Sequence, residues 1–203
     1  MTSILLFSGG VDSTCVACWL RPTHLLFVDY GQVAADGERR AASMIAPLLE
    51  LELDEIRIDL RLLGAGSLAS SAPSPHGAHP EFWPYRNQFL VSVAAARALQ
   101  VGADLVMAGS VSTDDRHVDG SAAFYRQADQ LVAMQEGGIH VRAPAVDMTA
   151  EALVTLAKPS DEVLSWTHSC HTGSIACGSC GGCIKRQSVL RTTERLQSDV
   201  HPK

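Results

Sequence analysis

The sequence predicts an α/β protein, in which a five-stranded, mostly parallel sheet has helices on both faces and is followed by a small subdomain built on four cysteines. Three observations support this class. Short apolar runs alternate with longer helical patterns, a glycine-rich turn follows the first apolar run, and four cysteines lie close together near the C-terminus. The 203 residues are enough for one such domain with a small appendage.

Short apolar runs bounded by turn residues are expected to form the strands. They are Ile4–Phe7, His24–Asp29, Glu55–Leu60, Leu105–Gly109 and Ile139–Arg142. Longer segments with helical periodicity lie between them. They are Gly10–Leu20, Gly37–Leu49, Asn87–Leu99, Ser121–Glu136 and Thr149–Lys158. Because helices connect the strands, the strands should run parallel, and Ser8, Tyr30 and Gly109, which each follow a strand, should converge on one edge of the sheet.

We divide the chain into a nucleotide-binding domain, residues 1–166, and a zinc-binding subdomain with a C-terminal helix, residues 167–203. The segment from Leu63 to Pro84 is rich in Gly, Ser, Ala, Pro and His. A connection of this length without secondary structure of its own is typical of an active-site lid or of a disordered loop. We expect a mobile loop over the site, and a tolerated insertion is the alternative.

Composition limits the classes of function. The formal net charge of −6 disfavours binding to duplex nucleic acid, which normally requires a basic surface. No apolar run reaches membrane-spanning length, and the N-terminus has no basic region before its first apolar run, so neither a membrane partner nor a signal peptide is expected. The six cysteines then indicate a reducing compartment, and we expect a cytoplasmic protein.

The turn after the first strand has the features of an anion-binding site. Its residues are Ser8, Gly9, Gly10, Val11, Asp12, Ser13 and Thr14. A helix that begins here offers unpaired N–H groups and a partial positive charge, and the two glycines let a phosphate approach the backbone closely. The loop lacks the lysine of a Walker motif and contains Asp12, which would repel phosphate unless a divalent cation lies between them. This pattern favours magnesium-bound ATP, and an ordinary turn that caps a helix is the alternative.

The second strong signal is the cysteine cluster. Cys170, Cys177, Cys180 and Cys183 have a spacing that can close a tetrahedral zinc site. Four protein ligands leave no open position for water, so the zinc would be structural. His168 or His171 could replace one cysteine, and an iron–sulfur cluster is the rival occupant. By contrast, Cys15 and Cys18 in the first helix are expected to pack in the core, because free cysteines commonly behave as small apolar residues.

Together these motifs resemble the 7-cyano-7-deazaguanine synthase (QueC) family of PP-loop ATP pyrophosphatases, and the chain looks like a divergent member. The resemblance runs from Ile4 to about Leu190. It is carried by Ser8–Thr14, by Asp29-Tyr30-Gly31-Gln32, by Pro84-Tyr85-Arg86-Asn87, and by Cys170–Cys183 with the following Arg186. The resemblance implies the PP-loop, HUP-like version of the predicted fold.

The resemblance also implies an ATP-dependent ligase that forms carbon–nitrogen bonds and releases AMP and pyrophosphate. Such an enzyme adenylates the carboxyl of 7-carboxy-7-deazaguanine, forms an amide with ammonia, and adenylates that amide to give the nitrile. The implied cofactors are ATP, Mg²⁺ and a structural Zn²⁺. The partners are the small deazaguanine substrate and ammonia, and we expect a homodimer.

Site residues follow from the same resemblance. The phosphates are expected on Ser8, Gly9, Gly10, Asp12, Ser13 and Thr14, and the nucleotide or base pocket on Asp29, Tyr30, Gly31, Gln32, Gly109 and Arg186. The residues expected to act on the reacting groups are Asp12, Ser13, Arg86, Asn87 and Asp119. A guanidinium such as that of Arg86 can grip a carboxylate or phosphate through two parallel hydrogen bonds. The amide of Asn87 and the carboxylate of Asp119 suit the edges of a guanine-like ring.

Three departures from the family pattern leave alternatives open. Val33-Ala34 replaces Arg-His, Asp119-Gly120-Ser121 replaces Asp-Cys-Arg, and Thr149-Ala150-Glu151 replaces Lys-x-Glu. Lys185, Arg142 or a partner subunit could replace the lost lysine. One alternative is a paralogue that stops at the amide or joins the deazaguanine to an amine of a partner protein, as paralogues that accompany antiphage systems would do. The other is a non-catalytic subunit that binds the nucleotide or the deazaguanine.

Overall fold

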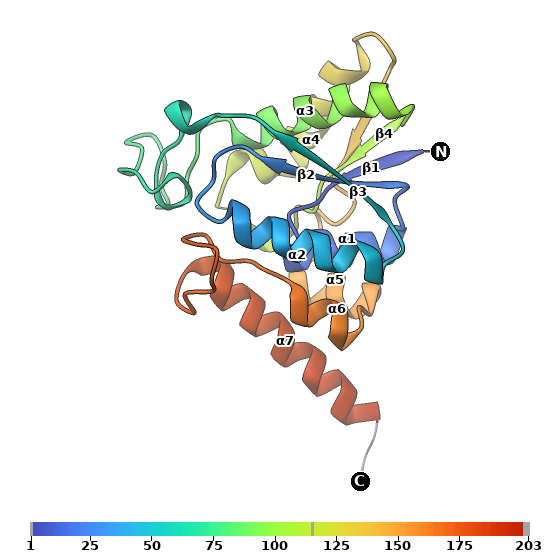
Figure 1. Cartoon of the computed structure of the whole chain (residues 1–203), viewed down its shortest axis with the longest axis vertical. Coiled ribbons are helices and arrows are strands. Elements are labelled where there is room, and N and C mark those ends of the chain that lie inside the picture. The colour runs from blue at the N-terminus through green and yellow to red at the C-terminus, as the bar shows by residue number, and fades with distance from the viewer. Residues whose placement is uncertain (1, 115, 201–203) are drawn as a thin grey trace.

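The sheet has five strands in the order β3-β2-β1-β4-β5, and each neighbouring pair is parallel. The protein is described here from a computed structural model, which covers residues 2–114 and 116–200. The strands are β1 (Ser3–Leu6), β2 (His24–Asp29), β3 (Glu52–Arg57), β4 (Leu105–Met107) and β5 (His140–Arg142). Their order and direction confirm the predicted α/β class (Figure 1).

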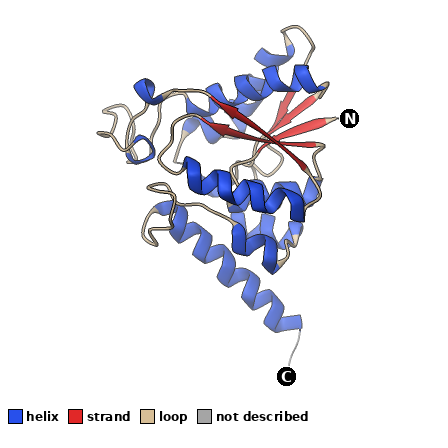
Figure 2. Ribbon diagram, in the orientation of Figure 1, coloured by secondary structure: helices blue, strands red, loops and turns tan. Residues whose placement is uncertain are grey.

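Helices cover both faces of this sheet, as predicted. On one face lie α1 (Val11–Leu20) and α2 (Ala35–Leu48), and on the other lie α3 (Arg86–Val101) and α4 (Ala122–Ala133) (Figure 2). This arrangement follows from the right-handed crossover of parallel strands, because the chain passes from β1 out to β3 and then returns across the sheet to β4.

Three C-terminal helices form a further layer on the α1 and α2 side (Figure 1). They are α5 (Ala150–Ala157), α6 (Asp161–Trp166) and α7 (Gly181–Val200). Helix α5 packs on α1, α6 on α2, and α7 on α5. Helix α7 is the expected C-terminal helix, and residues 201–203 of the predicted subdomain lie outside the described residues.

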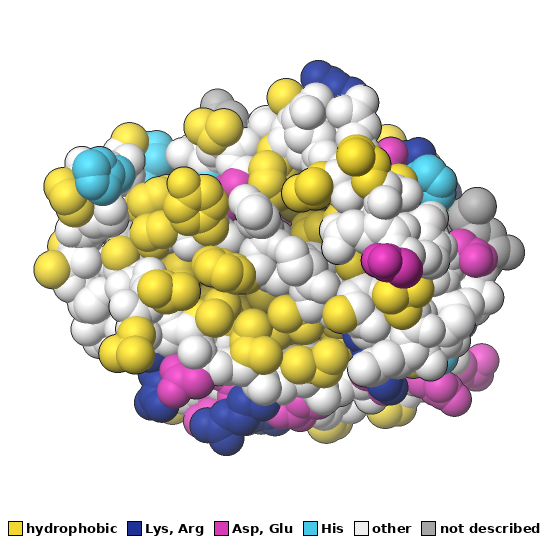
Figure 3. Space-filling view, turned by 90° about the horizontal axis from the view of Figure 1, so that it is seen from above, with side chains coloured by type: hydrophobic (Ala, Val, Ile, Leu, Met, Phe, Trp, Pro, Cys, Tyr) yellow, Lys and Arg dark blue, Asp and Glu magenta, His cyan; other side chains and the backbone are white. Residues whose placement is uncertain are grey.

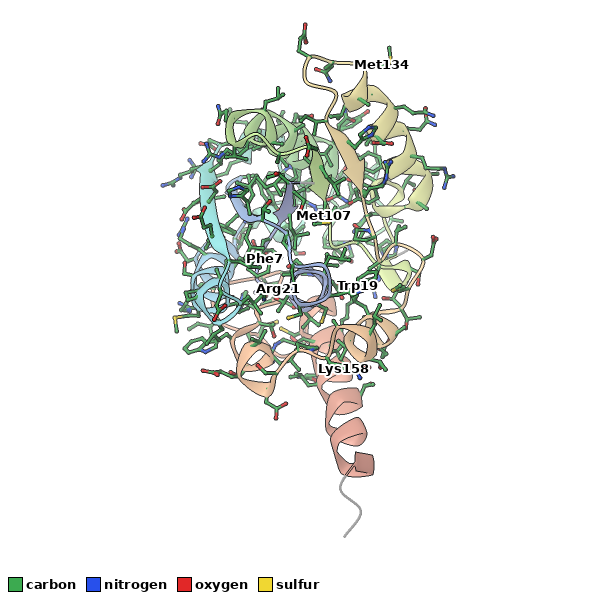
Figure 4. The ribbon with its side chains drawn as sticks, turned by 90° about the vertical axis from the view of Figure 1, so that its right-hand side faces the viewer. Phe7, Trp19, Arg21, Met107, Met134 and Lys158 are labelled. Carbon is green, nitrogen blue, oxygen red and sulfur yellow. The ribbon has the colours of Figure 1, made fainter. Side chains whose placement is uncertain are left out.

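Two cores sandwich the sheet, and they explain why the strands read as continuous apolar runs. Leu5 and Phe7 enter the core beneath α1, whereas Ile4 enters the core beneath α3 and α4, because successive side chains of a strand point to opposite faces. Phe7 and Met107 lie between the strands and α1 (Figure 4). Cys15 is fully buried in this same core, as expected, and burial raises the pKa of its thiol.

Strand β3 lies three residues earlier than the predicted Glu55–Leu60. Its whole length, Glu52–Arg57, pairs with β2. The predicted strand ended too late because Ile58 and Leu60 are apolar and continue the alternating pattern of β3 beyond its last residue. These two residues still donate their N–H groups to the carbonyl oxygens of Asp29 (2.8 Å) and Tyr30 (3.1 Å), so the chain stays beside β2 after the strand ends.

Helix α6 was not predicted, whereas the other predicted strands and helices are confirmed with small shifts of their ends. The feature of the sequence that could have indicated α6 is its N-terminal cap, Ser160. Ser160 accepts a hydrogen bond from the N–H of Val163 (3.3 Å), and Asp161 and Glu162 place negative charge in the first turn. The helix is short, so it shows too little periodicity to be recognised from apolar spacing.

The segment 63–84 is anchored at several points. It begins at the last residue of one 3-10 turn, Arg61–Leu63, and contains another, Ser67–Ala69. It also buries Leu68 and Trp83 in the core beneath α3 and α4. The ring of Trp83 meets that of Tyr30 edge-on, with the ring centroids 5.0 Å apart. The expected mobility of this loop stays a prediction.

Hydrophobic side chains gather on the face over α3 and α4 (Figure 3). Leu99, Leu131 and Met134 are among the exposed apolar residues there. The expected homodimer stays a prediction. Within the described part of the chain, no helix combines the length and the apolar character that a membrane crossing requires.

Candidate functional site

A cavity of about 570 Å³ opens at the carboxyl ends of the strands. It lies where the order of the sheet reverses, because the chain leaves β1 toward β2 but later returns to place β4 on the other side of β1. Ser8, Tyr30 and Gly109, which follow β1, β2 and β4, all line it. The predicted convergence of these three residues is therefore confirmed.

The loop after β1 is shaped by glycines. Gly9 has a φ of +70°, and a Cβ there would lie 2.7 Å from the Cβ of Ala41 in α2. Gly109 lies so close to the start of α1 that a Cβ on it would be 2.8 Å from the Cα of Ser13. Both positions therefore require glycine, one for its backbone angle and the other for the close approach of two chain segments.

Small hydroxyl groups fix this loop and face the cavity. Ser8 Oγ accepts a hydrogen bond from Gly10 N (3.2 Å), and Ser13 Oγ donates one to Gly10 O (3.2 Å). Both serines line the cavity together with Gly10 and Asp12. Thr14 differs, because its side chain is fully buried and does not line the cavity. The first turn of α1 adds N–H groups without intrahelical acceptors, which is the geometry of an anion site.

A lysine from the far end of the sequence reaches this loop. Lys185 Nζ lies 2.6 Å from Asp12 Oδ2, although 173 residues separate them. Thr149, where the family lysine is expected, caps α5 by accepting a hydrogen bond from Ala152 N (3.1 Å). Arg142 forms an ion pair with Asp129 and does not line the cavity. Of the two replacement cations considered from the sequence, only Lys185 lies at the site.

The four cysteines are gathered as a metal site requires. Their sulfur atoms all lie within 4.8 Å of one another, and the Cys177–Cys183 and Cys170–Cys180 pairs are each 4.0 Å apart. Sulfurs at the corners of a tetrahedral zinc site stand about 3.8 Å apart, from Zn–S bonds of about 2.3 Å. The Thr172 hydroxyl and the N–H groups of Ser179 and Cys180 lower the pKa of Cys177 to about 5. The cluster can therefore hold a metal ion such as zinc.

The cysteine loop is fastened to the loop after β1. His168 N donates a hydrogen bond to Gly9 O (2.9 Å), and Val11 N donates to Ser169 Oγ (3.4 Å). The His168 ring is hydrogen-bonded to Gly173 O (3.0 Å) and is not part of the sulfur cluster. The same cluster fixes the start of α7, because Cys183 lies in its first turn. A metal at the cysteines would thus support both the loop and Lys185.

A second group of cavity residues is built around the Arg86 guanidinium. Arg86 begins α3, and its Nε donates to Asn87 Oδ1 (3.2 Å). Burial acts to lower the pKa of Arg86, but Tyr30, Asp119, Tyr125 and Glu38 outweigh it and raise this pKa. Arg86 is therefore a firmly charged cation in an enclosed setting. A partly buried guanidinium of this kind suits recognition of a carboxylate or phosphate group.

Glu38, in the first turn of α2, is the acid of this group. Its Oε2 accepts a hydrogen bond from Gln32 Nε2 (2.7 Å), and it lines the cavity beside Tyr30. Burial raises the pKa of Glu38, while Gln32 and Arg86 oppose that shift. Burial likewise raises the pKa of the Tyr30 phenol, which stays protonated. The cavity is thus lined by a half-buried acid, a buried phenol and a half-buried guanidinium.

Several predicted site residues support the cavity from outside it. Asp29 Oδ2 accepts from Arg39 Nη2 (2.7 Å), and Gln32 Oε1 accepts from Tyr30 N (2.9 Å). Asp119 Oδ2 accepts from Asn87 N (3.2 Å) and so orients the residue next to Arg86. The predicted residues that line the cavity are Ser8, Gly10, Asp12, Ser13, Tyr30, Arg86, Asn87, Gly109 and Arg186. Those that do not line it are Gly9, Thr14, Asp29, Gly31, Gln32 and Asp119.

Sequence reasoning missed a further set of lining residues, which comes from scattered positions. Tyr125 OH and Ser110 Oγ are 2.7 Å apart, and Arg116 Nη1 is 3.1 Å from Glu81 Oε1. All four line the cavity, as does Glu38. A signal existed only for Ser110, which directly follows Gly109 at the end of a predicted strand. The others lie inside helices or in loops whose path the sequence does not specify.

Comparison with known proteins gives one consistent result. The model of the family described as "Queuosine biosynthesis protein QueC" matches residues 2–194. The chain is 27% identical over 205 residues to "7-cyano-7-deazaguanine synthase 1" of Desulfitobacterium hafniense. That alignment covers 95% of this chain and 92% of the relative. It is 32% identical over 205 residues to "7-cyano-7-deazaguanine synthase" of Methanothrix thermoacetophila, and this alignment covers 91% of this chain and 92% of the relative.

Proposed function

The chain belongs to the QueC family of queuosine biosynthesis proteins, and from that premise we propose that it converts 7-carboxy-7-deazaguanine to an amide and then to a nitrile, with ATP and ammonia. The supporting observation is that the loop after β1 and the buried Arg86 group share one cavity. One part suits a polyphosphate, and the other suits a planar acid with polar edges.

The first half of the reaction needs a nucleophilic carboxylate and a departing pyrophosphate. A carboxylate oxygen of the substrate attacks the α-phosphorus of ATP, the bond to the β-phosphate breaks, and an acyl adenylate forms. Ammonia then adds to the acyl carbon, its nitrogen loses a proton, and AMP departs, which leaves the amide. Charge grows on the pyrophosphate in this step. The N–H groups at the start of α1, with Ser8, Ser13 and Lys185 of the cavity lining, are proposed to stabilise it.

In the second half the amide oxygen attacks the α-phosphorus of another ATP and releases pyrophosphate. Loss of AMP and two protons from nitrogen then gives the nitrile. Arg86 is proposed to hold the acid or amide, with Asn87 beside it. Glu38, Tyr30, Ser110 and Tyr125 offer acceptors and donors to the edges of the deazaguanine ring.

Two metals fit the chain. The carboxylate of Asp12 is a hard oxygen ligand of the kind Mg²⁺ prefers, and we propose that it helps to hold magnesium-bound ATP. Magnesium would supply neutralisation of phosphate charge. Zinc is proposed at the four cysteines, whose thiolate set and spacing suit it, and its role there would be structural. The homodimer and the cytoplasmic location are further proposals.

The decisive experiment incubates the purified protein with 7-carboxy-7-deazaguanine, MgATP and ammonium, and follows products by mass. We expect the nitrile with two AMP and two pyrophosphate per molecule. Amide alone, with one AMP, would identify an enzyme that stops at the amide. A deazaguanine adduct on an added partner protein would identify the conjugating alternative. Binding of both ligands without pyrophosphate release would identify a non-catalytic subunit and contradict the proposal.

An inactive variant controls for contaminating enzymes. Asp12→Asn keeps the size of the side chain but removes the charge proposed for magnesium. The proposal expects AMP formation to disappear in this variant. AMP formation at the same rate in both proteins would show that it does not arise at this cavity.

A further inference from the structure

The described residues that line the cavity include four with a permanent positive charge, and they have different settings. Arg86 belongs to the buried group around Tyr30 and Glu38. Arg116 pairs with Glu81, and Arg186 is held by the end of α6, where its Nη2 donates to Leu164 O (3.0 Å). Lys185 contacts the loop after β1, through Asp12. Among the contacts described for these four residues, it is the one that reaches this loop.

The position of Lys185 is fixed from two directions. Its Nζ is 2.6 Å from Asp12 Oδ2, and the exposed fractions of the two side chains are 24% and 19%, so the pair is largely shielded from water. On the other side, α7 begins at Gly181, directly beside the cysteine cluster, and Gly181 and Gly182 also line the cavity. The ammonium group is therefore placed at the cavity by a helix whose start the cysteines anchor.

In the part of the chain that the structure describes, neither α5 nor the loop after β1 supplies a cation at this cavity. Helix α5 presents Ala150 and Glu151 to the same cavity, and Thr149 at its start serves as a cap. The loop after β1 contributes hydroxyls, backbone groups and the acid Asp12, but no lysine or arginine. A polyphosphate that enters here would therefore meet the carboxylates of Asp12 and Glu151 and, beside this loop, the ammonium group of Lys185. Lysine binds phosphate as a compact point charge, and it keeps this ability without a fixed bonding geometry.

We propose that Lys185 is the cation that binds the phosphates of the nucleotide lost as pyrophosphate, and that its pairing with Asp12 keeps the ammonium group aimed into the cavity before the nucleotide enters. The proposal rests on the proposed function, because it assumes that ATP binds in this cavity. In this chain the phosphate-binding positive charge thus comes from the helix after the cysteine cluster and not from the loop after β1 or from α5.

Calorimetric titration with ATP and adenosine, both in the presence of Mg²⁺, tests the proposal. Lys185→Met should weaken ATP binding by about 10-fold to 100-fold and leave adenosine binding within about twofold, because only the phosphates meet the ammonium group. It should also flatten the dependence of ATP affinity on salt, since one screened charge pair is lost. Lys185→Arg should recover at least part of the affinity.

Lys158→Met is the matched control. Lys158 ends α5 at the opposite end from Ala150 and lies outside the cavity (Figure 4). The control should bind ATP like the unaltered protein. Equal ATP affinities for Lys185→Met and Lys158→Met would overturn the role of Lys185 while leaving the proposed function intact. Failure of the unaltered protein to bind ATP would instead overturn both.

A double-mutant cycle separates direct contact from an effect through Asp12. In the Asp12→Asn background, Lys185→Met should still weaken ATP binding by about 10-fold, because the ammonium group is proposed to act on the phosphates themselves. If the loss disappears in that background, Lys185 only positions Asp12, and the proposal is wrong.

Discussion

The two parts of the cavity are built in opposite ways. The part around α1 consists of backbone groups and small hydroxyls from consecutive residues, Ser8 to Ser13, with one lysine from a distant helix. The part around Arg86 consists of large buried or half-buried side chains from several elements, among them Tyr30, Glu38 and Tyr125. A polyphosphate is flexible and highly charged, and many donors can satisfy it. A rigid ring with a fixed set of polar edges needs side chains placed by the whole fold.

This difference predicts where each substitution will act. Changes in the α1 part should weaken nucleotide binding and spare the acid substrate, and changes in the Arg86 part should do the reverse. The two binding steps can be measured separately, with ATP alone and with 7-carboxy-7-deazaguanine alone. The following substitutions are ordered from the largest expected effect to the smallest.

Loss of Arg86 should have the largest effect. Arg86→Met is expected to lower kcat/KM for 7-carboxy-7-deazaguanine by at least about 100-fold, the range found when one preorganised charge or donor is removed from an active site. ATP affinity should change little. Arg126→Met, on the exposed side of α4, is the control and should keep full activity. Steady-state kinetics with both substrates would make the comparison, and a loss confined to ATP affinity would contradict this assignment.

The same variant should also lose stability, because removing one member of a buried charged group leaves Glu38 without its neighbouring cation. Addition of Glu38→Gln should restore the midpoint of thermal unfolding but not the activity. This pair of results would separate the role of Arg86 in substrate binding from its role in folding. Recovery of activity in the double variant would show that only folding was affected.

Removal of the metal proposed at the cysteines should reduce ATP affinity by about 10-fold, because His168 and Ser169 then lose their fixed contacts with Gly9 and Val11. Affinity for the deazaguanine acid should fall less. The measurement is an ATP titration of the protein before chelation, after chelation and after zinc is restored, with metal content determined at each stage. Unchanged affinity in metal-free protein would break the proposed link between the cysteine loop and the α1 part.

Two adjacent hydroxyls provide a finer test of the α1 part. Ser13→Ala should weaken ATP binding by about 10-fold, since hydrogen bonds to charged groups contribute about 1.5–3 kcal/mol. Thr14→Val should leave ATP affinity within about twofold, because the Thr14 hydroxyl is fully buried, has no hydrogen-bond partner in the described part of the chain, and does not line the cavity. Calorimetric titration of both variants would check this. Equal losses in the two variants would mean that Thr14 also reaches the phosphates.

The smallest expected effect concerns the pH dependence of stability. Burial raises the pKa of Glu38, so between its ordinary and its raised pKa the folded protein holds a proton that the unfolded chain has released. This carboxyl therefore reduces the stability of the fold as pH rises through that interval. Glu38→Gln should therefore gain stability relative to the unaltered protein as pH rises above the ordinary pKa of a glutamate, about 4.3, as measured by urea unfolding. A constant difference across that range would show that burial does not raise the Glu38 pKa.

The comparison of the two parts also explains what the sequence could reveal. The residues of the α1 part are contiguous, and a strand, a glycine turn and a helix start already specify their geometry. Glu38 and Tyr125 lie within helices, where periodicity predicts a face but does not say which side chain meets a cavity. Lys185 was considered only as a replacement for an expected lysine, and its contact with Asp12 depends on how α7 packs. Asp29 was predicted to line the site, but its carboxylate is taken up by Arg39.

The same reasoning applies to the fold. The sheet and its main helices follow from alternating apolar runs, because both faces of each parallel strand must be buried. The end of β3 could not be fixed, since Ile58 and Leu60 continue its pattern after the ladder ends. Helix α6 is stabilised mainly by its Ser160 cap and by packing on α2, and local sequence gives little sign of that packing.

The central claim is that an acid bound beside Arg86 is adenylated by ATP held at the start of α1. Substrate labelled with ¹⁸O in both carboxyl oxygens tests it most directly, because the oxygen that attacks the α-phosphorus leaves with AMP. The account predicts one ¹⁸O atom in each AMP formed, for the amide step and again for the nitrile step. Product formed with unlabelled AMP, or with ADP in place of AMP, would contradict it.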